Sequence, residues 1–287
     1  MLNLANILLP VDFSEQSIAA GRYAAMLACR FQSQVTMLHV VPYELPIGGF
    51  EAPVAPSSWP EIMDEARGRL ESFMTEEFRR IRVGRLVLEG DPARRIVEIA
   101  HSEGVNLIVM PTHGYGPFRR FLVGSVTAKV LHDADCAVLT SAHIEKDAQP
   151  ESLSMRNIVC AVDLGPQSAA ELAWAVDFAS QFSAQLHVVH ALPALNAGVA
   201  RYFDQDFKAA LERDAKERIV SLLEGIDEHA KIVLDFGDVA TVVRSAAEGA
   251  HADLLVVGRH SSSGLLGRLR AHAYAIVREA PCPVISV

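Results

Sequence analysis

The sequence predicts an α/β protein made of two tandem, doubly wound domains, each built on a five-stranded parallel sheet. One observation is length: 287 residues, 50% of them hydrophobic and 21% charged, are enough for two domains that each bury a core of their own. A second observation is an internal repeat that spans the chain. A third is the alternation, inside each repeat, of short apolar runs with helical patterns.

The internal repeat is visible in three pairs of segments. Residues 6–12 (NILLPVD) return as 157–163 (NIVCAVD), residues 90–91 (GD) return as 237–238, and residues 106–113 (NLIVMPTH) return as 253–260 (DLLVVGRH). The chain is therefore interpreted as a tandem duplication. We place domain 1 at 1–141, a polar linker at 142–156, and domain 2 at 157–287.

Near-continuous apolar runs in the first repeat predict strands that are covered on both faces, as in a parallel sheet. The predicted strands span residues 7–11, 35–41, 85–88, 105–110 and 137–140. Helices are predicted to start at Ser14, at Asp91 with Pro92 in the first helical position, and at Ser125. An amphipathic pattern predicts a helix at 61–80. Five prolines in 42–60 predict an irregular loop.

The second repeat has the same order of runs, with Pro166 and Asp238 at the matching helix starts. The last strand of each domain would leave an unpaired sheet edge, so we expect the two halves to pack as a pseudo-two-fold pair through these strands. The chain would then be an intramolecular pseudo-dimer, which leaves open a further homodimer.

Composition limits the class of protein. The net charge of −9 argues against a protein that coats nucleic acid or an anionic membrane. No apolar run approaches the roughly 18–20 residues that cross a bilayer, and the first residues lack the pattern of a secretion signal. The four cysteines are widely spaced, which favours buried, reduced thiols. A cytoplasmic protein is expected.

Ligands of open parallel sheets bind at the carboxyl ends of the strands, and three segments of the first repeat meet there. Pro10, Val11 and Asp12 end the first predicted strand, and Val40 lies near the end of the second. Residues 111–125 follow the fourth strand. These segments are the candidates for a binding site.

The segment after the fourth strand favours a phosphate group. Gly124 and Ser125 open a predicted helix, whose free N–H groups and dipole attract an anion. Gly114 supplies a flexible backbone, and His113 adds a polar donor. Asp12, which only accepts hydrogen bonds when ionised, suits a ribose hydroxyl or an adenine amino group. Together these residues suit a nucleotide.

The same residues also have structural interpretations. The spacing of Asp12 and Ser14 fits a helix cap equally well. A Gly-x-Gly pair at 114–116 is weak evidence for phosphate by itself. His39 and His190 end apolar strands, which is more typical of hydrogen-bonded core histidines than of ligands. We expect no metal site and no catalytic residue.

The strand-ending Val-Asp, the late glycine loop and the closing Gly-Ser-Val resemble the universal stress protein family, and the resemblance covers both halves. Its nucleotide-binding members carry Gly-x2-Gly-x9-Gly-Ser/Thr after the fourth strand. Here the segment has Gly114, nine further residues, and then Gly124, Ser125 and Val126, with Pro111 in place of the first glycine.

This resemblance implies a Rossmann-like fold and ATP as the ligand, with a divalent cation on its phosphates. It implies contacts of Asp12 and Val40 with adenine or ribose. It implies contacts of Gly114, Gly124, Ser125 and Val126 with the phosphates. Pro111 has no N–H to offer, so one backbone contact of the family is missing.

The second repeat departs further from the motif. It keeps Gly258, but Ser261 replaces the second glycine, and Arg270-Ala271 or Ala271-His272 replaces the closing Gly-Ser. A side chain there intrudes on the family's phosphate position. The loop is also basic, through Arg259, Arg268, Arg270 and His272, which leaves an anion site open. Any adenine nucleotide is expected to prefer the first repeat.

The leading hypothesis is a tandem universal stress protein that binds ATP or another adenine nucleotide as a regulatory module in the stress response. The alternative is a nucleotide-independent scaffold that binds protein partners or a small ligand. The sequence has no Gly-x4-Gly-Lys loop, no Gly-x-Ser-x-Gly elbow and no His-Glu-x-x-His pair. At most, slow ATP hydrolysis is expected.

Overall fold

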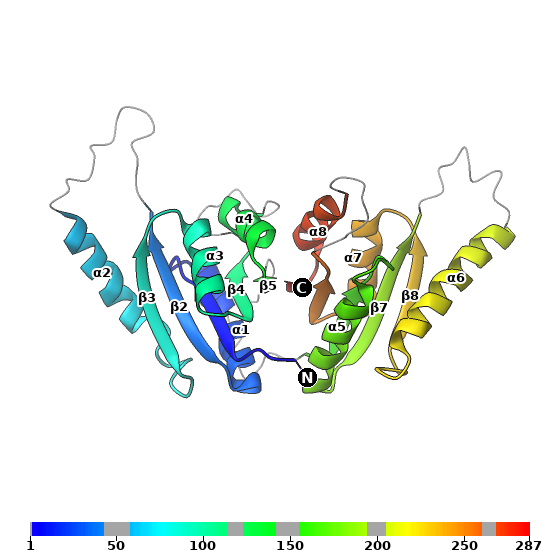
Figure 1. Ribbon diagram of the computed structural model, residues 1–287, viewed down its shortest axis with the longest axis horizontal. Coiled ribbons are helices and arrows are strands. Elements are labelled where there is room, and N and C mark those ends of the chain that lie inside the picture. Colours follow the sequence, from blue (N-terminus) through cyan, green and yellow to red (C-terminus); the bar gives the residue numbers. More distant parts are fainter. Residues whose placement is uncertain (1, 43–57, 114–122, 142–154, 194–204, 260–267) are drawn as a thin grey trace, which may run out of the picture.

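The computed structural model describes residues 2–42, 58–113, 123–141, 155–193, 205–259 and 268–287 (Figure 1). Within these ranges strands and helices alternate, and each half contributes five strands and four helices. The predicted α/β class is confirmed. Most of the predicted loop (43–57) and most of the predicted linker (142–154) lie outside the described residues.

The first half consists of β1 (Asn6–Pro10), α1 (Glu15–Phe31), β2 (Gln34–Val41), α2 (Trp59–Ser72), β3 (Val83–Glu89), α3 (Pro92–Ser102), β4 (Leu107–Pro111), α4 (Ser125–Asp133) and β5 (Ala137–Ser141). The second half repeats this order with β6 (Asn157–Ala161), α5 (Ser168–Phe182), β7 (Gln185–Leu192), α6 (Gln205–Leu223), β8 (Lys231–Phe236), α7 (Val239–Gly249), β9 (Leu254–Val257), α8 (Arg268–Glu279) and β10 (Val284–Ser286). Every strand predicted for the first half is present, with its ends shifted by no more than two residues.

The ten strands form one sheet in the order β3-β2-β1-β4-β5-β10-β9-β6-β7-β8. Neighbouring strands are parallel within each half. The chain reverses its direction of growth between β1 and β4, and again between β6 and β9. Such reversals are the points at which open parallel sheets bind ligands, so each half has one.

The two halves meet through β5 and β10, which pair antiparallel. Val284 lies opposite Thr140, and Ser286 lies opposite Val138. The hydroxyls of Thr140 and Ser286 donate across the junction to the carbonyls of Val284 and Val138, both at 3.3 Å. The expected pseudo-two-fold packing through the last strands is confirmed, and it leaves neither strand as an open edge.

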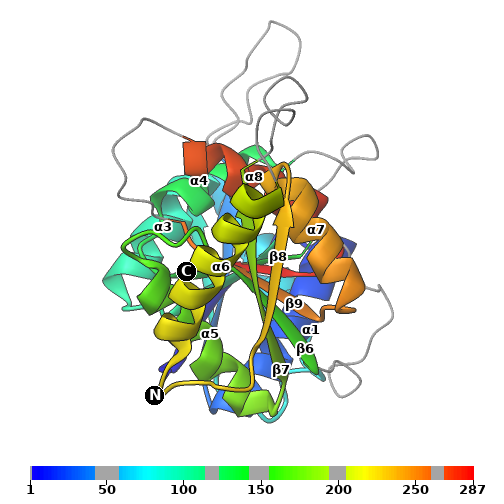
Figure 2. The ribbon, with the colours of Figure 1, turned by 90° about the vertical axis from the view of Figure 1, so that its right-hand side faces the viewer.

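Helices cover both faces of the sheet (Figure 2). On one face, α1, α2, α5 and α6 pack around a single apolar cluster that runs through both halves. On the other face, α3 and α4 cover a cluster in the first half, and α7 and α8 cover a separate cluster in the second. The fully buried core is therefore continuous on one face and divided on the other, where the half-buried Leu131 of α4 packs against both clusters.

Aromatic side chains join the halves on the continuous face. Phe31, at the end of α1, contacts Phe178 and Phe182 of α5, with ring centroids 5.7 and 6.0 Å away. The Arg30 guanidinium lies 5.5 Å from the centre of the Phe182 ring. These contacts hold the ends of α1 and α5 together.

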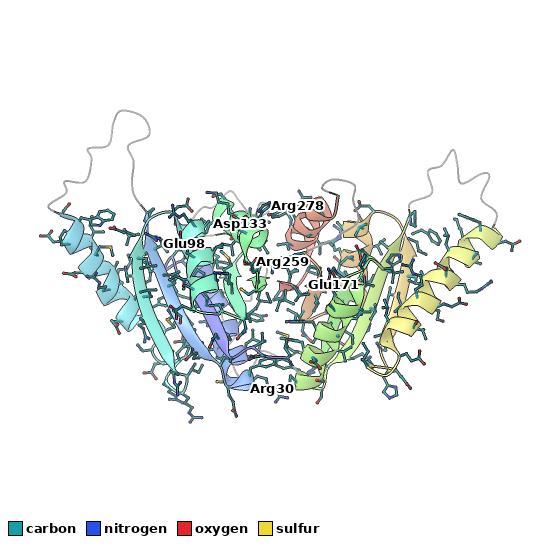
Figure 3. The ribbon with its side chains drawn as sticks, in the orientation of Figure 1. Arg30, Glu98, Asp133, Glu171, Arg259 and Arg278 are labelled. Atoms are coloured by element: carbon teal, nitrogen blue, oxygen red, sulfur yellow. The ribbon has the colours of Figure 1, made fainter. Side chains whose placement is uncertain are left out.

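Hydrogen bonds join the halves on the divided face. Arg259, which follows β9, donates to the carbonyls of Ala134, at 2.8 Å, and Cys136. The Tyr274 hydroxyl of α8 donates to the Ala128 carbonyl of α4 at 2.6 Å. Arg259 lies at this junction in Figure 3.

Polar caps start several helices where the sequence predicts them. Ser14, Asp91 and Asp238 cap α1, α3 and α7, and each accepts a hydrogen bond at 2.9–3.1 Å from the N–H three residues later. These side chains satisfy N–H groups that have no partner inside the helix. By contrast, α5 begins at Ser168, slightly later than the Pro166 start that was predicted.

The predicted helix at 61–80 is wrong at its end, because α2 stops at Ser72. Phe73 has an extended backbone, and Met74 has a φ of 51°. The Arg85 guanidinium of β3 donates to the carbonyls of Leu70, at 2.9 Å, and Phe73, at 3.4 Å. Tertiary hydrogen bonds thus take over carbonyls at the end of the helix, which no helical periodicity reveals.

The expectation of buried thiols is wrong for one cysteine. Cys160 and Cys282 are buried and Cys136 is half-buried, but Cys29, near the end of α1, is exposed. All four are free.

Replacing Phe178 with alanine tests the continuous core. Phe178 is 1% exposed and stacks on Trp174, with ring centroids 5.1 Å apart. Because the cavity would lie between the halves, Phe178→Ala is expected to lower the free energy of unfolding by about 3–5 kcal/mol in urea denaturation. The control Val220→Ala, at a side chain 52% exposed, should change it by about 0.5 kcal/mol or less. A loss for Phe178→Ala as small as that of the control would contradict this account of the junction.

Candidate functional site

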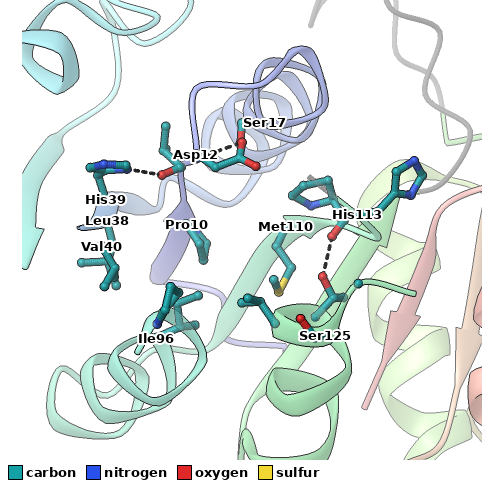
Figure 4. Close-up of a pocket in the computed structure, with 16 residues that line it drawn as sticks. Pro10, Asp12, Ser17, Leu38, His39, Val40, Ile96, Met110, His113 and Ser125 are labelled. Carbon is teal, nitrogen blue, oxygen red and sulfur yellow. Dashed lines mark hydrogen bonds between the residues drawn. The ribbon is translucent and has the colours of Figure 1, made fainter. Parts of the chain in front are cut away.

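A cavity of about 240 Å³ lies at the switch point of the first half, beyond the carboxyl ends of β1 and β4 (Figure 4). Its lining includes every predicted site residue that the structure describes, namely Pro10, Val11, Asp12, Val40, His113, Gly124, Ser125 and Val126. The other predicted site residue, Gly114, lies outside the described residues. Sequence reasoning missed further lining side chains, which are Ser17, Leu38, Pro92, Ile96, Met110 and Thr127.

Asp12 has two carboxylate oxygens with different surroundings. Oδ1 accepts hydrogen bonds from the Ser14 N–H at 2.9 Å, the Ser14 hydroxyl at 2.5 Å, and the Ser17 hydroxyl. Within the described residues, Oδ2 accepts none. The structural interpretation of Asp12 is thus correct for one oxygen, and the other remains available at the cavity.

His39 joins the ends of β1 and β2. Its Nδ1 lies 2.7 Å from the Val11 carbonyl, which only accepts, so Nδ1 carries the proton. Burial lowers the pKa of His39, so the ring is neutral at pH 7. The Phe13 ring lies 4.5 Å from the imidazole. His39 is therefore a hydrogen-bonded core histidine, as expected, and it also forms part of the cavity wall.

The amino end of α4 forms another wall. The Gly124 N–H donates to the Thr112 carbonyl at 2.7 Å, and the Thr127 hydroxyl donates to the Pro111 carbonyl at 3.0 Å. These bonds hold the start of the helix against the end of β4. The N–H groups of the first turn have no acceptor inside the helix, and the helix dipole is positive here. This wall suits an anion.

A second cavity of about 190 Å³ lies at the equivalent place in the second half. Asp163 repeats the role of Asp12, because its Oδ1 accepts from the Gly165 N–H at 2.7 Å and the Ser168 hydroxyl at 3.0 Å. His190 repeats the role of His39, with Nδ1 2.8 Å from the Val162 carbonyl. The duplication has preserved the frame of the site in both halves.

The two cavities differ in one pair of positions. Glu171 of α5 lies in the second cavity and is only 9% exposed (Figure 3). A Cβ on Gly258 would lie 1.8 Å from Glu171 Oε1, so the carboxylate occupies the space that a side chain at 258 would need. The first repeat has Ala20 and Pro111 at these positions. The first half thus combines alanine on the helix with proline at the end of the strand, and the second half combines glutamate on the helix with glycine after the strand.

Burial raises the pKa of Glu171 to about 7, and the nearby charge of Asp163 adds to the effect. Sequence reasoning missed this residue. The signal was a charged residue on the apolar face of α5, one helical turn before the buried Ala175 and in line with Phe178.

Arg259 does not take the role that the basic loop suggested. Its guanidinium crosses to the first half, and Arg259 is absent from the lining of the second cavity. Arg270 and Ala271 lie in the first turn of α8.

Comparison with known proteins identifies the family. The sequence model of the universal stress protein family matches residues 4–141 and again 155–287. The chain belongs to the universal stress protein family. Both halves of this tandem universal stress protein are matched, which agrees with the internal repeat.

Some relatives match the whole chain and others match about half of it. Universal stress protein Rv2005c of Mycobacterium tuberculosis is 26% identical over 297 residues, which cover 97% of this chain and 95% of the relative. Universal stress protein MJ0531 of Methanocaldococcus jannaschii is 33% identical over 147 residues, 49% of this chain and 84% of its own length. A universal stress protein structure from Archaeoglobus fulgidus superposes with a TM-score of 0.71 at 20% identity, over 99% of this chain and 96% of that one. The Rossmann-like fold predicted from the resemblance is confirmed.

Two further findings concern the described part of the universal stress protein. No described helix has the length and apolar character needed to span a bilayer. The described side chains contain no group of three or more His, Cys, Asp or Glu that could hold a metal ion.

Replacing Glu171 with glutamine should change how stability depends on pH. The pKa of this carboxyl is 4.5 in the unfolded chain and about 7 in the folded protein. Its ionisation therefore destabilises the folded state, and the free energy of unfolding falls as pH rises from about 4.5 to about 7 and levels off above that. The free energy of unfolding of the wild type, relative to Glu171→Gln, should therefore fall by about 2–3 kcal/mol between pH 5 and pH 8. Urea denaturation at several pH values measures this difference.

The control for this measurement is Glu212→Gln on the exposed side of α6, which should change stability by less than about 0.5 kcal/mol. A pH-independent difference between the wild type and Glu171→Gln would show that Glu171 is ionised in the cavity at pH 5.

Proposed function

We propose that the cavity of the first half binds ATP or another adenine nucleotide, and that the protein acts as a nucleotide-dependent regulatory module in a stress response. The observation that carries the proposal is the convergence of the Asp12 carboxylate and the amino end of α4 on one cavity with apolar walls. A divalent cation would accompany the phosphates.

The apolar part of the cavity suits the base and the sugar. Val11, Val40, Ile96 and Met110 supply surfaces for a flat, weakly polar ring. Asp12 Oδ2 is an available acceptor for a ribose hydroxyl or an amino group. Because Oδ1 is held by the cap of α1, the side chain is already oriented before a ligand binds.

The amino end of α4 suits the phosphates. The N–H groups of Ser125 and Val126, in the first turn of the helix, and the positive end of the helix dipole would stabilise negative charge. Gly124 allows close approach, since any side chain there would press on the Thr112 carbonyl 3.3 Å away. Pro111 offers no N–H, but its carbonyl positions Thr127 and so helps to fix the helix.

The second half favours the alternative function, a role without nucleotide. The Glu171 carboxylate brings negative charge to the cavity in which a triphosphate would have to bind. This charge adds to the loss of the closing Gly-Ser. We therefore propose one nucleotide per chain, in the first half.

Titration calorimetry with ATP tests the proposal, with an expected stoichiometry near one per chain. Ser125→Glu places a carboxylate where phosphate should lie and should weaken binding about 100-fold, whereas the helix dipole favours an acidic residue there and preserves the fold. Asp12→Asn keeps an oxygen for the cap of α1 but removes the charge, and should weaken binding about tenfold.

The matched control is Ser102→Glu, which adds the same charge at the exposed carboxyl end of α3, and it should bind like the wild type. Unchanged affinity in Ser125→Glu would overturn the proposed phosphate position. A stoichiometry of two would overturn the proposed asymmetry.

A further inference from the structure

The second cavity contains a carboxyl side chain with no partner. Glu171 is 9% exposed and lies among the lining residues. No described residue donates a hydrogen bond to its carboxyl group. Buried polar groups are normally hydrogen-bonded, because an unpaired one costs free energy. An unpaired buried carboxyl in a cavity indicates a missing donor.

A second acceptor lies at the same cavity. The hydrogen bonds to Asp163 from Gly165 and Ser168 both end on Oδ1. Asp163 Oδ2 accepts none within the described residues. The cavity therefore presents carboxyl oxygens from α5 and from the segment that follows β6, and no described residue supplies the donors that would satisfy them.

The other described walls are almost entirely apolar. Among the described side chains, the remaining titratable groups beside Glu171 are His190, which is bonded to the Val162 carbonyl, and Cys160, whose buried thiol is kept neutral because burial raises its pKa. The described lining residues of α7, α8 and β9 are Val239, Val243, Val257, Gly258, Ala273 and Ile276. No described cationic side chain lines the cavity.

We infer that the cavity of the second half is a binding site for a small primary amine, a single ammonium group on an apolar body. The ammonium would donate to Glu171 and to Asp163 Oδ2, and the body would contact the valine, alanine and isoleucine walls. An ammonium group has three donors and no acceptor, which complements the unpaired carboxyl oxygens among the described lining residues. The volume of about 190 Å³ is smaller than typical drug-sized pockets of about 300–1,000 Å³, so the body is small.

Other ligands fit the cavity less well. A calcium or magnesium ion takes about six or more oxygen ligands, whereas the described lining residues include two carboxyl groups. A phosphate or carboxylate ligand would meet like charge. A neutral alcohol offers one donor and no charge.

Binding of an ammonium group is coupled to the proton on Glu171. The ligand favours the ionised carboxylate, so binding below pH 7 must release a proton, and affinity should rise with pH. Between pH 6 and pH 8 the ionised fraction of a group with a pKa of about 7 increases about tenfold, and so should the affinity.

Calorimetry on the full chain tests the site with three ligands that share a cyclohexane ring and differ in the polar group attached to it. They are cyclohexylamine, cyclohexanol and cyclohexanecarboxylate. The amine should bind about 10- to 100-fold more tightly than the alcohol, and the carboxylate should not bind. Glu171→Gln, which keeps the shape of the side chain, should remove the preference for the amine. Glu212→Gln on α6 is the charge-matched control and should keep it.

Several outcomes would overturn the inference. They are equal binding of amine and alcohol, an unchanged preference in Glu171→Gln, an amine affinity that stays flat or falls from pH 6 to pH 8, and no binding of the amine. Because the test uses no nucleotide and a different half of the chain, its failure is distinguishable from failure of the proposed ATP site.

Discussion

The antiparallel pairing of β5 with β10 is the constraint on which the rest of the molecule depends. It joins two parallel sheets, each of which would otherwise end in an open edge. It also brings α1 against α5 on one face and α4 against α8 on the other, where the aromatic cluster and the Tyr274 hydrogen bond form. Both cavities lie near this junction. Thr127 lines the first cavity and Ala273 lines the second. The next residues along the chain, Ala128 and Tyr274, form the hydrogen bond between α4 and α8.

Much of the fold could be predicted because its signals are local. Apolar runs fixed the strands, and Ser14, Asp91 and Asp238 marked helix starts through caps that involve neighbours in sequence. The end of α2 could not be predicted, since the hydrogen bonds that end it come from Arg85 on another element. Arg259 was misread for the same reason: its partners belong to the other half of the chain.

The candidate site divides in a similar way. Residues at strand ends and at the start of α4 were accessible to prediction, because topology alone places those ends together. Glu171 was not, because its importance depends on the absence of a side chain at Gly258, far away in sequence. Asp12 illustrates a different limit. The sequence posed a choice between a structural role and a ligand contact, whereas the structural hydrogen bonds use only Oδ1 of the carboxylate and so do not exclude the other role.

The contact between Glu171 and Gly258 also constrains how the two halves could diverge after duplication. Glutamate on the helix is compatible with glycine at the strand end, and proline at the strand end is compatible with alanine on the helix. Glutamate together with proline would force the carboxylate out of the position that it has in the second half. The two positions are therefore epistatic. A stepwise path through alanine with glycine avoids any displacement of the carboxylate. The steric contact between these positions thus couples their substitutions, independently of selection for any ligand.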